Sequence, residues 1–269
     1  MSDLKNKVVV ITGAANGLGK ALAIEFFRQG SQLVLLDVDM AGLERIKQEL
    51  DSSGKKISIY EVDVSNEQEV IAARLDILGK HPRIDILVNN AGVSISQYFR
   101  DIDPEDFRRI FDINFWGTVY CTRHFLPEMA GDGSRIVNII SGFALMGFPG
   151  KTAYGASKSA IMGFSNALKT ELADSGVKVC LVVPPPLDTG LVKNGKHIDA
   201  LKREKEVMFL KEKGQPIERT AKLIVEGVRH GKERIVVGRM MFWTDVASRL
   251  FPTLLHRAIG KRKDRFDFL

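Results

Sequence analysis

The chain has 269 residues, of which 45% are hydrophobic and 27% are charged, a composition typical of one globular α/β domain. No apolar run reaches the ~20 residues that a membrane-spanning helix needs. The net charge is +6 and the isoelectric point about 9.2, but no basic segment is interleaved with aromatic residues as in a base-stacking surface, so we do not expect nucleic-acid binding.

The first predicted strand, residues 7–12, is a short β-branched apolar run typical of a buried parallel strand. The loop Gly13-x-x-x-Gly17-x-Gly19 follows, and a helical pattern runs over 17–29. Glycines let the backbone approach a pyrophosphate, and a helix N-terminus offers free N–H groups and a positive dipole. This order predicts a dinucleotide site. The spacing is not G-x-G-x-x-G, so a plain glycine-rich turn is the alternative.

The second predicted strand, residues 32–37, ends in Asp37. A carboxylate at this position accepts hydrogen bonds from an adenosine ribose 2′-hydroxyl and repels a 2′-phosphate. Its expected neighbours Asn16 and Val38 carry no positive charge, so we expect NAD(H) to be favoured and NADP(H) disfavoured. The alternative is that Asp37 only caps the next helix, a role for which Asp39 is the better candidate.

Strands and helices alternate along the rest of the chain. The further predicted strands are 56–61, 84–88, 134–140, 177–183 and 234–238, and the further predicted helices are 40–52, 66–79, 104–130, 152–174 and 217–230. Alternation of this kind predicts a parallel sheet with helices on both faces and all strand ends at one edge. The residues at these ends are Gly13, Asp37, Asp63, Asn90, Ser141 and Pro184.

A possible acid/base group lies at the start of the predicted helix 152–174. Tyr154 and Lys158 are four residues apart, so they share one helix face, and Ser141 lies thirteen residues upstream. A lysine ammonium favours the phenolate, so we expect it to lower the tyrosine pKa from its reference near ~10. This arrangement suits proton transfer at a carbonyl or alcohol oxygen. The spacing alone arises by chance in many helices.

Together these features resemble the classical short-chain dehydrogenase/reductase (SDR) family over about residues 5–238. The matching motifs, in chain order, are Thr12-Gly13-x-x-x-Gly17-x-Gly19, Asp63-Val64, Asn89-Asn90-Ala91-Gly92, Asn114, and Ser141 with Tyr154 and Lys158. The resemblance implies an α/β fold of Rossmann type, a single-domain doubly wound parallel sheet with helices on both faces.

The resemblance also implies an enzyme that transfers hydride between NAD(H) and a secondary alcohol or ketone. Tyr154 would be the general acid/base, Lys158 would also bind the nicotinamide ribose, and Ser141 would orient the substrate oxygen. Asn114 would hold a water for proton relay. The residues expected to contact the cofactor are Gly13, Asn16, Gly17, Leu18, Gly19, Asp37, Asp63, Val64, Asn90, Ala91, Gly92, Tyr154, Lys158 and Thr189.

The chain departs from the family after the sixth strand, where Pro185 takes the place of the usual glycine in Pro184-Pro185-Pro186. Proline fixes φ and removes an N–H, so this wall of the nicotinamide pocket is expected to be stiffer. Thr189 remains placed to contact the carboxamide. Other reactions on this scaffold, such as epimerisation or dehydration, an NADP(H)-dependent ketone reductase, and a non-catalytic or regulatory NAD-binding protein remain alternatives.

Two segments bear on the substrate. By resemblance, residues 187–216 form the substrate-binding loop and its short helices, although a solvated surface helix is the alternative for its lysine-rich part. Four bulky apolar residues lie between Ser141 and Tyr154, namely Phe143, Leu145, Met146 and Phe148. They predict an apolar, lipid- or steroid-like substrate, unless they only pack beneath the loop.

We divide the chain into a catalytic domain, 1–238, and a basic amphipathic extension, 239–269. The extension holds seven Lys/Arg and three acids. Apolar residues recur in it at helical spacing, namely Trp243, Val246, Ala247, Leu250 and Leu254, and Pro252 is expected to break or kink the helix. Such a segment suits peripheral contact with an anionic membrane, or packing on its own core or a partner subunit.

The remaining expectations concern assembly and environment. By resemblance, helices 104–130 and 152–174 form the interface of a homodimer or homotetramer. The apolar residues available for it are Phe107, Ile110, Phe111, Phe115, Ile161 and Phe164, and the alternative is that they face the sheet. Cys121 and Cys180 show no metal spacing, so no metal is expected. With no visible signal peptide, we expect a cytoplasmic protein that can associate with a membrane surface.

Overall fold

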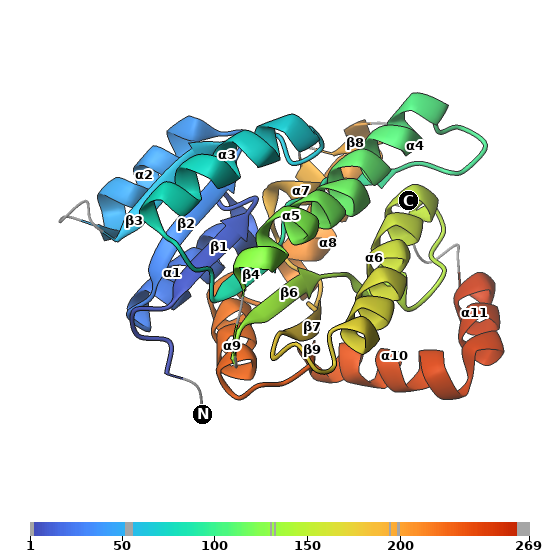
Figure 1. Ribbon diagram of the computed structural model, residues 1–269. Coiled ribbons are helices and arrows are strands. Elements are labelled where there is room, and N and C mark those ends of the chain that lie inside the picture. The colour runs from blue at the N-terminus through green and yellow to red at the C-terminus, as the bar shows by residue number, and fades with distance from the viewer. Residues whose placement is uncertain are drawn as a thin grey trace.

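The computed structural model describes residues 3–51, 56–129, 131, 133–193, 195–197 and 200–262. Seven parallel strands form one twisted sheet in the order β3-β2-β1-β4-β6-β7-β9, with helices on both faces (Figure 1). The strands are β1 (Val8–Thr12), β2 (Gln32–Asp37), β3 (Ile57–Glu61), β4 (Ile86–Asn89), β6 (Arg135–Ile139), β7 (Lys178–Val183) and β9 (Arg234–Val236). The order reverses direction between β1 and β4, which is where doubly wound sheets bind ligands.

The larger helices follow the expected crossovers. They are α1 (Gly17–Arg28), α2 (Met40–Leu50), α3 (Glu67–Lys80), α4 (Pro104–Phe111), α5 (Gly117–Phe125), α6 (Thr152–Glu171) and α9 (Ile217–Arg229). Asp39 caps α2 by accepting a hydrogen bond from the N–H of Gly42, as predicted. Each predicted element of the main sheet is found within a few residues of its expected bounds.

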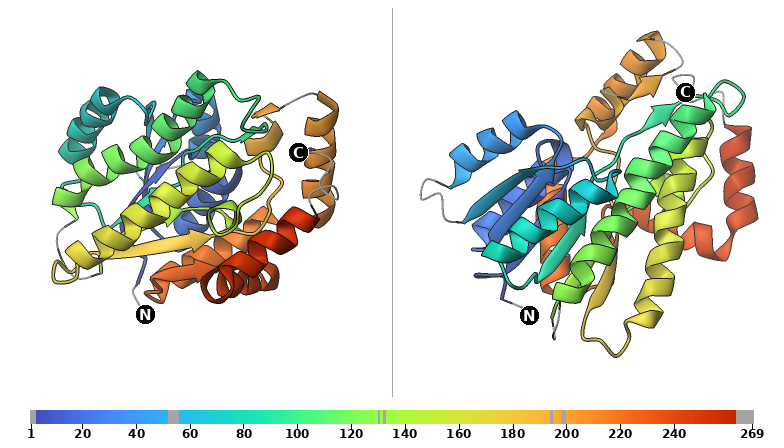
Figure 2. Two further views of the ribbon diagram at one scale, coloured as in Figure 1. Left: turned by 90° about the vertical axis from the view of Figure 1, so that its right-hand side faces the viewer. Right: turned by 45° about the horizontal axis from the view of Figure 1, so that its top comes forward.

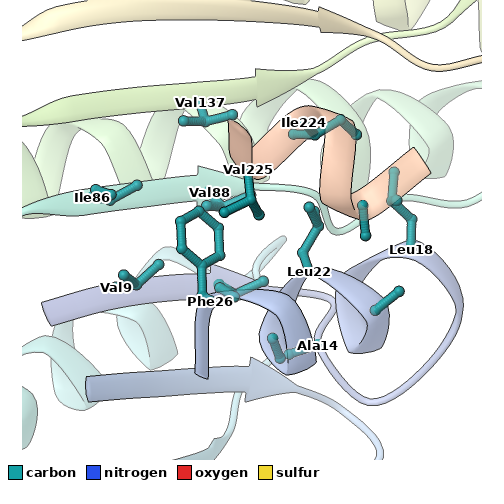
Figure 3. Packing of buried hydrophobic residues seen from close by; sticks show 14 of the residues in the cluster. Val9, Ala14, Leu18, Leu22, Phe26, Ile86, Val88, Val137, Ile224 and Val225 are labelled. Atoms are coloured by element: carbon teal, nitrogen blue, oxygen red, sulfur yellow. The ribbon is translucent and has the colours of Figure 1, made fainter. Parts of the chain in front are cut away.

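One face of the sheet is covered by α1, α2 and α9. Leu18, Leu22 and Phe26 of α1 point toward Ile224 and Val225 of α9 (Figure 3). These side chains also pack on strand residues such as Val9, Val88 and Val137. All are buried, and burial of each such side chain stabilises the fold by ~1.5–3 kcal/mol.

The opposite face is covered by α3, α5 and α6, which pack on Val10, Leu36 and Leu87. The core therefore has two layers around a sheet that is buried on both faces, which explains why its strands read as continuous apolar runs. This rigid frame places the loops after β1, β2, β4, β6 and β7 along one edge.

The predicted helix 104–130 is wrong as a single element. It divides into α4, one π-helical turn η1 (Asp112–Trp116), α5, and a 3-10 turn η2 (Leu126–Glu128). Residue 130 lies outside the described residues, as does residue 52 of the predicted helix 40–52. The π-turn inserts an extra residue beside Asn114, and such bulges concentrate at functional sites.

The segment 187–216 contains short helices, which the resemblance implies, and one short strand. It holds α7 (Gly190–Lys193), β8 (Lys196–His197) and α8 (Ala200–Lys213), while residues 194, 198 and 199 lie outside the described residues. Strand β8 pairs in parallel with β5 (Ile95–Ser96), which forms a second, two-stranded sheet. The helix α8 projects beyond the main sheet (Figure 2).

The C-terminal extension forms α10 (Arg239–Leu250) and α11 (Pro252–Lys261), and residues 263–269 lie outside the described residues. The helix is interrupted at Phe251, and Pro252 is the first residue of α11, in agreement with the prediction. Met241 joins a buried cluster with Leu145 and Ile161, so α10 packs partly on the chain's own core. Figure 2 shows α10 and α11 beside α6.

Candidate active site

The glycine loop packs so closely that three of its positions exclude a side chain. Gly13 and Gly17 have positive φ of 63° and 54°, which favours glycine. A Cβ on Gly13 would lie 2.7 Å from Ala91 Cα, and one on Gly19 would lie 2.0 Å from the Gly13 carbonyl oxygen. Asn16 precedes α1 but gives it no side-chain capping bond, so the first-turn N–H groups have no acceptor from this residue. Bare backbone beside a helix N-terminus fits a pyrophosphate.

Asp37 is tied to this loop. Its carboxylate accepts hydrogen bonds from the N–H of Ala15 at 2.9 Å and from the N–H of Asp39 at 3.0 Å. Asp37 therefore does not cap α2, and its charge lies at the mouth of the loop. Arg45 of α2, which sequence reasoning missed, lies 3.7 Å from Asp39, whose carboxylate balances it. The hydrogen bond from Gly42 and the neighbouring Arg45 help to hold the pKa of Asp39 below its usual value.

The next two strand ends supply Asp63-Val64 and Asn90-Ala91-Gly92. Asp63 accepts hydrogen bonds from the N–H and the hydroxyl of Ser65, and Val64 is buried. The Asn90 amide donates to the carbonyls of Thr12 and Gly13, both at 3.0 Å. Asn90 thus ties the glycine loop to the end of β4. These two hydrogen bonds alone account for an asparagine at this position.

Asn114 sits fully buried in the π-turn and connects three segments. Its amide donates to the carbonyl of Val93 at 3.1 Å and to the hydroxyl of Ser157 at 3.0 Å, while its oxygen accepts from the N–H of Val93 at 2.8 Å. Ser157 in turn donates to the carbonyl of Tyr154 at 2.8 Å. Sequence reasoning missed Ser157, although it lies inside the Tyr154–Lys158 motif.

Gly92 lies directly against the same group. A Cβ at this position would be 3.0 Å from Asn114 Oδ1 and 3.4 Å from Lys158 Nζ. The end of β4, the π-turn and α6 therefore converge on one small volume.

Ser141, Tyr154 and Lys158 meet at the end of β6. Ser141 precedes a short 3-10 turn, η3 (Gly142–Ala144), and its hydroxyl accepts from the N–H of Phe143 at 3.2 Å. Burial raises the pKa of Tyr154 to about 12, although a hydrogen bond to Ser141 acts in the opposite direction. Burial lowers the pKa of Lys158 to about 8, and its ammonium donates to the carbonyl of Ile139 at 3.0 Å.

The prediction of a lowered tyrosine pKa is therefore wrong for the protein chain by itself. Loss of solvation penalises the phenolate more than Ser141 stabilises it. Lys158 lies four residues after Tyr154 on the helix, as predicted. However, burial also disfavours the ammonium of Lys158, which donates its hydrogen bond to a backbone carbonyl. Perturbed titratable groups at a sheet edge still mark a candidate functional site.

The loop after β7 closes the other side. Thr189 lies over the glycine loop, because a Cβ on Gly17 would be 3.1 Å from Thr189 Cβ. Pro185 is buried and the N–H of Gln215 donates to the carbonyl of Pro186 at 3.1 Å. Thr189 is thus brought together with the loop residues that sequence reasoning assigned to the cofactor.

The four apolar residues after Ser141 line a cavity of about 600 Å³ between η3, the start of α6 and α11. His256 and Ile259 of α11 form its outer side. The Phe143 ring stands edge-on to Tyr154 at 6.2 Å between centroids and lies between this cavity and the tyrosine. The cavity adjoins the tyrosine without containing it, so it is a neighbouring space rather than the reaction centre.

The described parts of the chain contain neither a membrane-spanning helix nor a metal-binding cluster. No helix there is long and apolar enough to cross a membrane. No group of three or more His, Cys, Asp or Glu side chains there is arranged to hold a metal ion, and Cys121 and Cys180 are buried free thiols.

Comparison with known proteins supports the same family. The model of the family described as short chain dehydrogenase matches residues 7–199. The Mycobacterium tuberculosis protein SadH is 34% identical over 273 residues, covering 99% of this chain and 98% of its own length. The Escherichia coli oxidoreductase UcpA is 37% identical over 196 residues, which cover 72% of this chain and 74% of UcpA.

Solved structures agree. A short-chain dehydrogenase/reductase from Burkholderia phymatum, in complex with NAD, superposes with a TM-score of 0.86 at 26% identity, covering 95% of this chain and 97% of that one. A 3-ketoacyl-(acyl-carrier-protein) reductase from Brucella melitensis, complexed with NADH, gives a TM-score of 0.74 at 27% identity, covering 87% and 97%. With its matching motifs, fold and relatives, the chain belongs to the short-chain dehydrogenase/reductase family.

Proposed function

We propose that this chain is an NAD(H)-dependent oxidoreductase that interconverts a secondary alcohol and a ketone. The observation that carries the proposal is the convergence of Ser141, Tyr154 and Lys158 with the buried Asn114 at the sheet edge that also holds the glycine loop. Support for a nicotinamide cofactor comes from family membership and from relatives solved with NAD and NADH.

The chain's own residues would divide the work as follows. Tyr154 donates a proton to the developing alkoxide in ketone reduction and accepts one in alcohol oxidation. Ser141 donates a hydrogen bond to the substrate oxygen, which stabilises charge in the transition state. Lys158 supplies positive charge beside the phenol, and Asn114 fixes the first turn of α6 through Ser157. The nicotinamide supplies the hydride chemistry when bound.

NAD(H) is preferred over NADP(H) in this proposal because Asp37 places a carboxylate at the mouth of the glycine loop. The glycine loop would hold the pyrophosphate, Asp63 and Val64 would meet the adenine, and Thr189 would contact the carboxamide. An apolar, lipid- or steroid-like substrate is favoured by Phe143, Leu145, Met146 and Phe148, which line the adjoining cavity.

The test is the variant Tyr154→Phe, which removes only the hydroxyl. We expect turnover to fall by ~10²-fold or more, since positioned acid/base groups contribute about that much. NADH binding, followed by fluorescence, should persist. Tyr60→Phe, which removes an exposed hydroxyl bonded to Asp76, is the matched control and should retain turnover. Full turnover in Tyr154→Phe would contradict the role of Tyr154 as the general acid/base.

A second proposal concerns peripheral membrane contact through α10 and α11. These helices expose Met240, Phe242, Trp243, Leu250, Phe251 and Leu254 next to several Arg and Lys residues. Truncation at Gly238 would expose the core around Met241, so point variants are the cleaner test. We expect Trp243→Ser with Leu254→Ser to abolish co-sedimentation with vesicles that contain anionic lipid. Negligible binding by the unmodified chain would exclude the contact.

A further inference from the structure

A buried polar cluster lies beside Tyr154, and none of its members has a role in the proposed proton transfer. It joins Lys151, just before α6, to Glu206 of α8, Ser96 of β5 and His197 of β8. Lys151 Nζ lies 2.6 Å from Glu206 Oε1 and also donates to the Ser96 hydroxyl. Ser96 donates to Glu206 Oε2 at 2.8 Å, and His197 Nε2 lies 3.2 Å from the same oxygen.

The cluster is almost completely sealed from solvent. The side chains of Lys151, Glu206 and His197 are 1%, 6% and 3% exposed. A buried ion pair gains little net stability, because loss of solvation offsets most of the attraction, and apolar residues of similar size would hold the fold as well. Such a pair instead fixes the relative orientation of the two segments, because the charged atoms must lie within hydrogen-bond distance of each other.

The cluster fixes α8 to the first turn of α6. Lys151 lies three residues before Tyr154, and its carbonyl accepts from the N–H of Gly155 at 2.7 Å. Its ammonium lies 5.8 Å from the centre of the Phe143 ring, which stands edge-on to Tyr154. Burial is the main cause of the raised pKa of Tyr154, and the Glu206 carboxylate adds to it. The helix α8 extends away from the main sheet (Figure 2), and Lys202 of α8 also lies 5.5 Å from the centre of the Tyr98 ring.

We infer that Lys151, Ser96 and Glu206 form a latch that holds α8 against the first turn of α6, and that they are positioning residues for the reaction at Tyr154. The inference rests on the proposed function of Tyr154. With the latch formed, α8 and the first turn of α6 keep one fixed relative position beside Phe143 and Tyr154. When one partner is removed, the other is a buried charge without its counter-ion, and α8 moves off to let it reach water.

The test uses Lys151→Met and Glu206→Gln, with Lys169→Met as a control that removes an exposed ion pair of α6 with Glu233. Amide hydrogen exchange over residues 200–212 is measured first, because it needs no substrate. We expect exchange in α8 to be at least tenfold faster in both latch variants and unchanged in the control. Unchanged exchange in the latch variants overturns the latch.

Steady-state kinetics then separate positioning from simple support of the fold. We expect KM for a ketone to rise at least tenfold in the latch variants, with kcat within threefold and the Kd for NADH unchanged. The double variant Lys151→Met with Glu206→Leu keeps the buried volume without charge. It should keep a Tm close to that of the unmodified protein but still show the raised KM.

If the double variant has a normal KM, apolar packing between α8 and α6 is sufficient for substrate binding, and a role for the ion pair is overturned. Faster exchange with unchanged KM overturns the positioning role. If the unmodified protein binds NADH but reduces no ketone, the proposed function fails instead, and the exchange of α8 still decides whether the latch exists.

Discussion

At the scale of single residues, Lys158 links the site to pH. Burial lowers its pKa to about 8, from an ordinary value of 10.5. Between these pH values the unfolded chain holds a proton that the folded chain has released, so stability rises with pH. The cost of burying the ammonium is present in full below about pH 8 and is absent above about pH 10.5.

The variant Lys158→Met removes this titration. At pH 7.5 its free energy of unfolding should exceed that of the unmodified protein. This difference should be smaller at pH 9.5. Urea unfolding of both proteins at the two pH values measures this difference in unfolding free energy. The contributions of other titrating groups cancel because both proteins contain them. An advantage of equal size at both values would show that Lys158 does not titrate in this range.

Asp37 is the residue on which cofactor choice depends. In Asp37→Asn the hydrogen bond from Ala15 can persist while the charge is lost. We expect the ratio of kcat/KM for NADH to that for NADPH to fall at least tenfold, which corresponds to ~1.4 kcal/mol. Asp76→Asn, on the exposed face of α3, is the charge-matched control. An unchanged ratio would remove the argument for NAD(H).

At the scale of elements, the glycine loop provides a sharp contrast between two alanine substitutions. A Cβ on Gly19 would lie 2.0 Å from the Gly13 oxygen, whereas one on Gly79 of α3 would meet nothing within 4 Å. Gly19→Ala should weaken NADH binding at least ~100-fold, because the loop must move. Gly79→Ala should stabilise the protein by about 0.5 kcal/mol. Calorimetric titration and thermal unfolding measure both; normal NADH affinity in Gly19→Ala would contradict the cradle.

The elements also show how far sequence reasoning extends. Buried parallel strands such as β1 and β7 and amphipathic helices such as α9 were predictable, because their patterns are local. The placement of the motif residues at one edge was also predictable, because the carboxyl ends of parallel strands lie at the same edge of the sheet. The π-turn at Asn114 was not predictable, because it depends on tertiary hydrogen bonds to Val93 and Ser157.

Two other features lay beyond local pattern. Strands β5 and β8 have two residues each, too few for a periodic signal, and they pair across 101 positions of the chain between Ile95 and Lys196. The partner of Lys151 could not be found in the sequence either, because Glu206 is brought to it only by the fold of residues 187–216. The raised pKa of Tyr154 likewise depends on burial rather than on the spacing to Lys158.

At the scale of the whole molecule, α4, α5 and α6 present a partly apolar outer face. Ile110 and Ile161 of the predicted interface set are buried within the chain, so they are not available to a partner. Trp116, 44% exposed, packs edge-on to Phe115 and stacks on Tyr120. In the proposed homodimer or homotetramer, Trp116 would be the anchor on this face.

We expect Trp116→Arg to lower the mass in solution, because a charge at the centre of an apolar interface is costly. Trp243→Arg, on the exposed side of α10, is the matched control and should leave the mass unchanged. Analytical ultracentrifugation measures both. Equal masses for Trp116→Arg and the unmodified chain would place the interface elsewhere.

We propose that the chain reduces ketones with NADH through Tyr154. This is tested by oxidation of NADH and of NADPH by the purified protein against ketones graded from small and polar to long-chain and steroidal. We expect turnover with NADH that rises with apolar size and is lost in Tyr154→Phe. A preference for NADPH, or binding of NADH without turnover of any ketone, would contradict it.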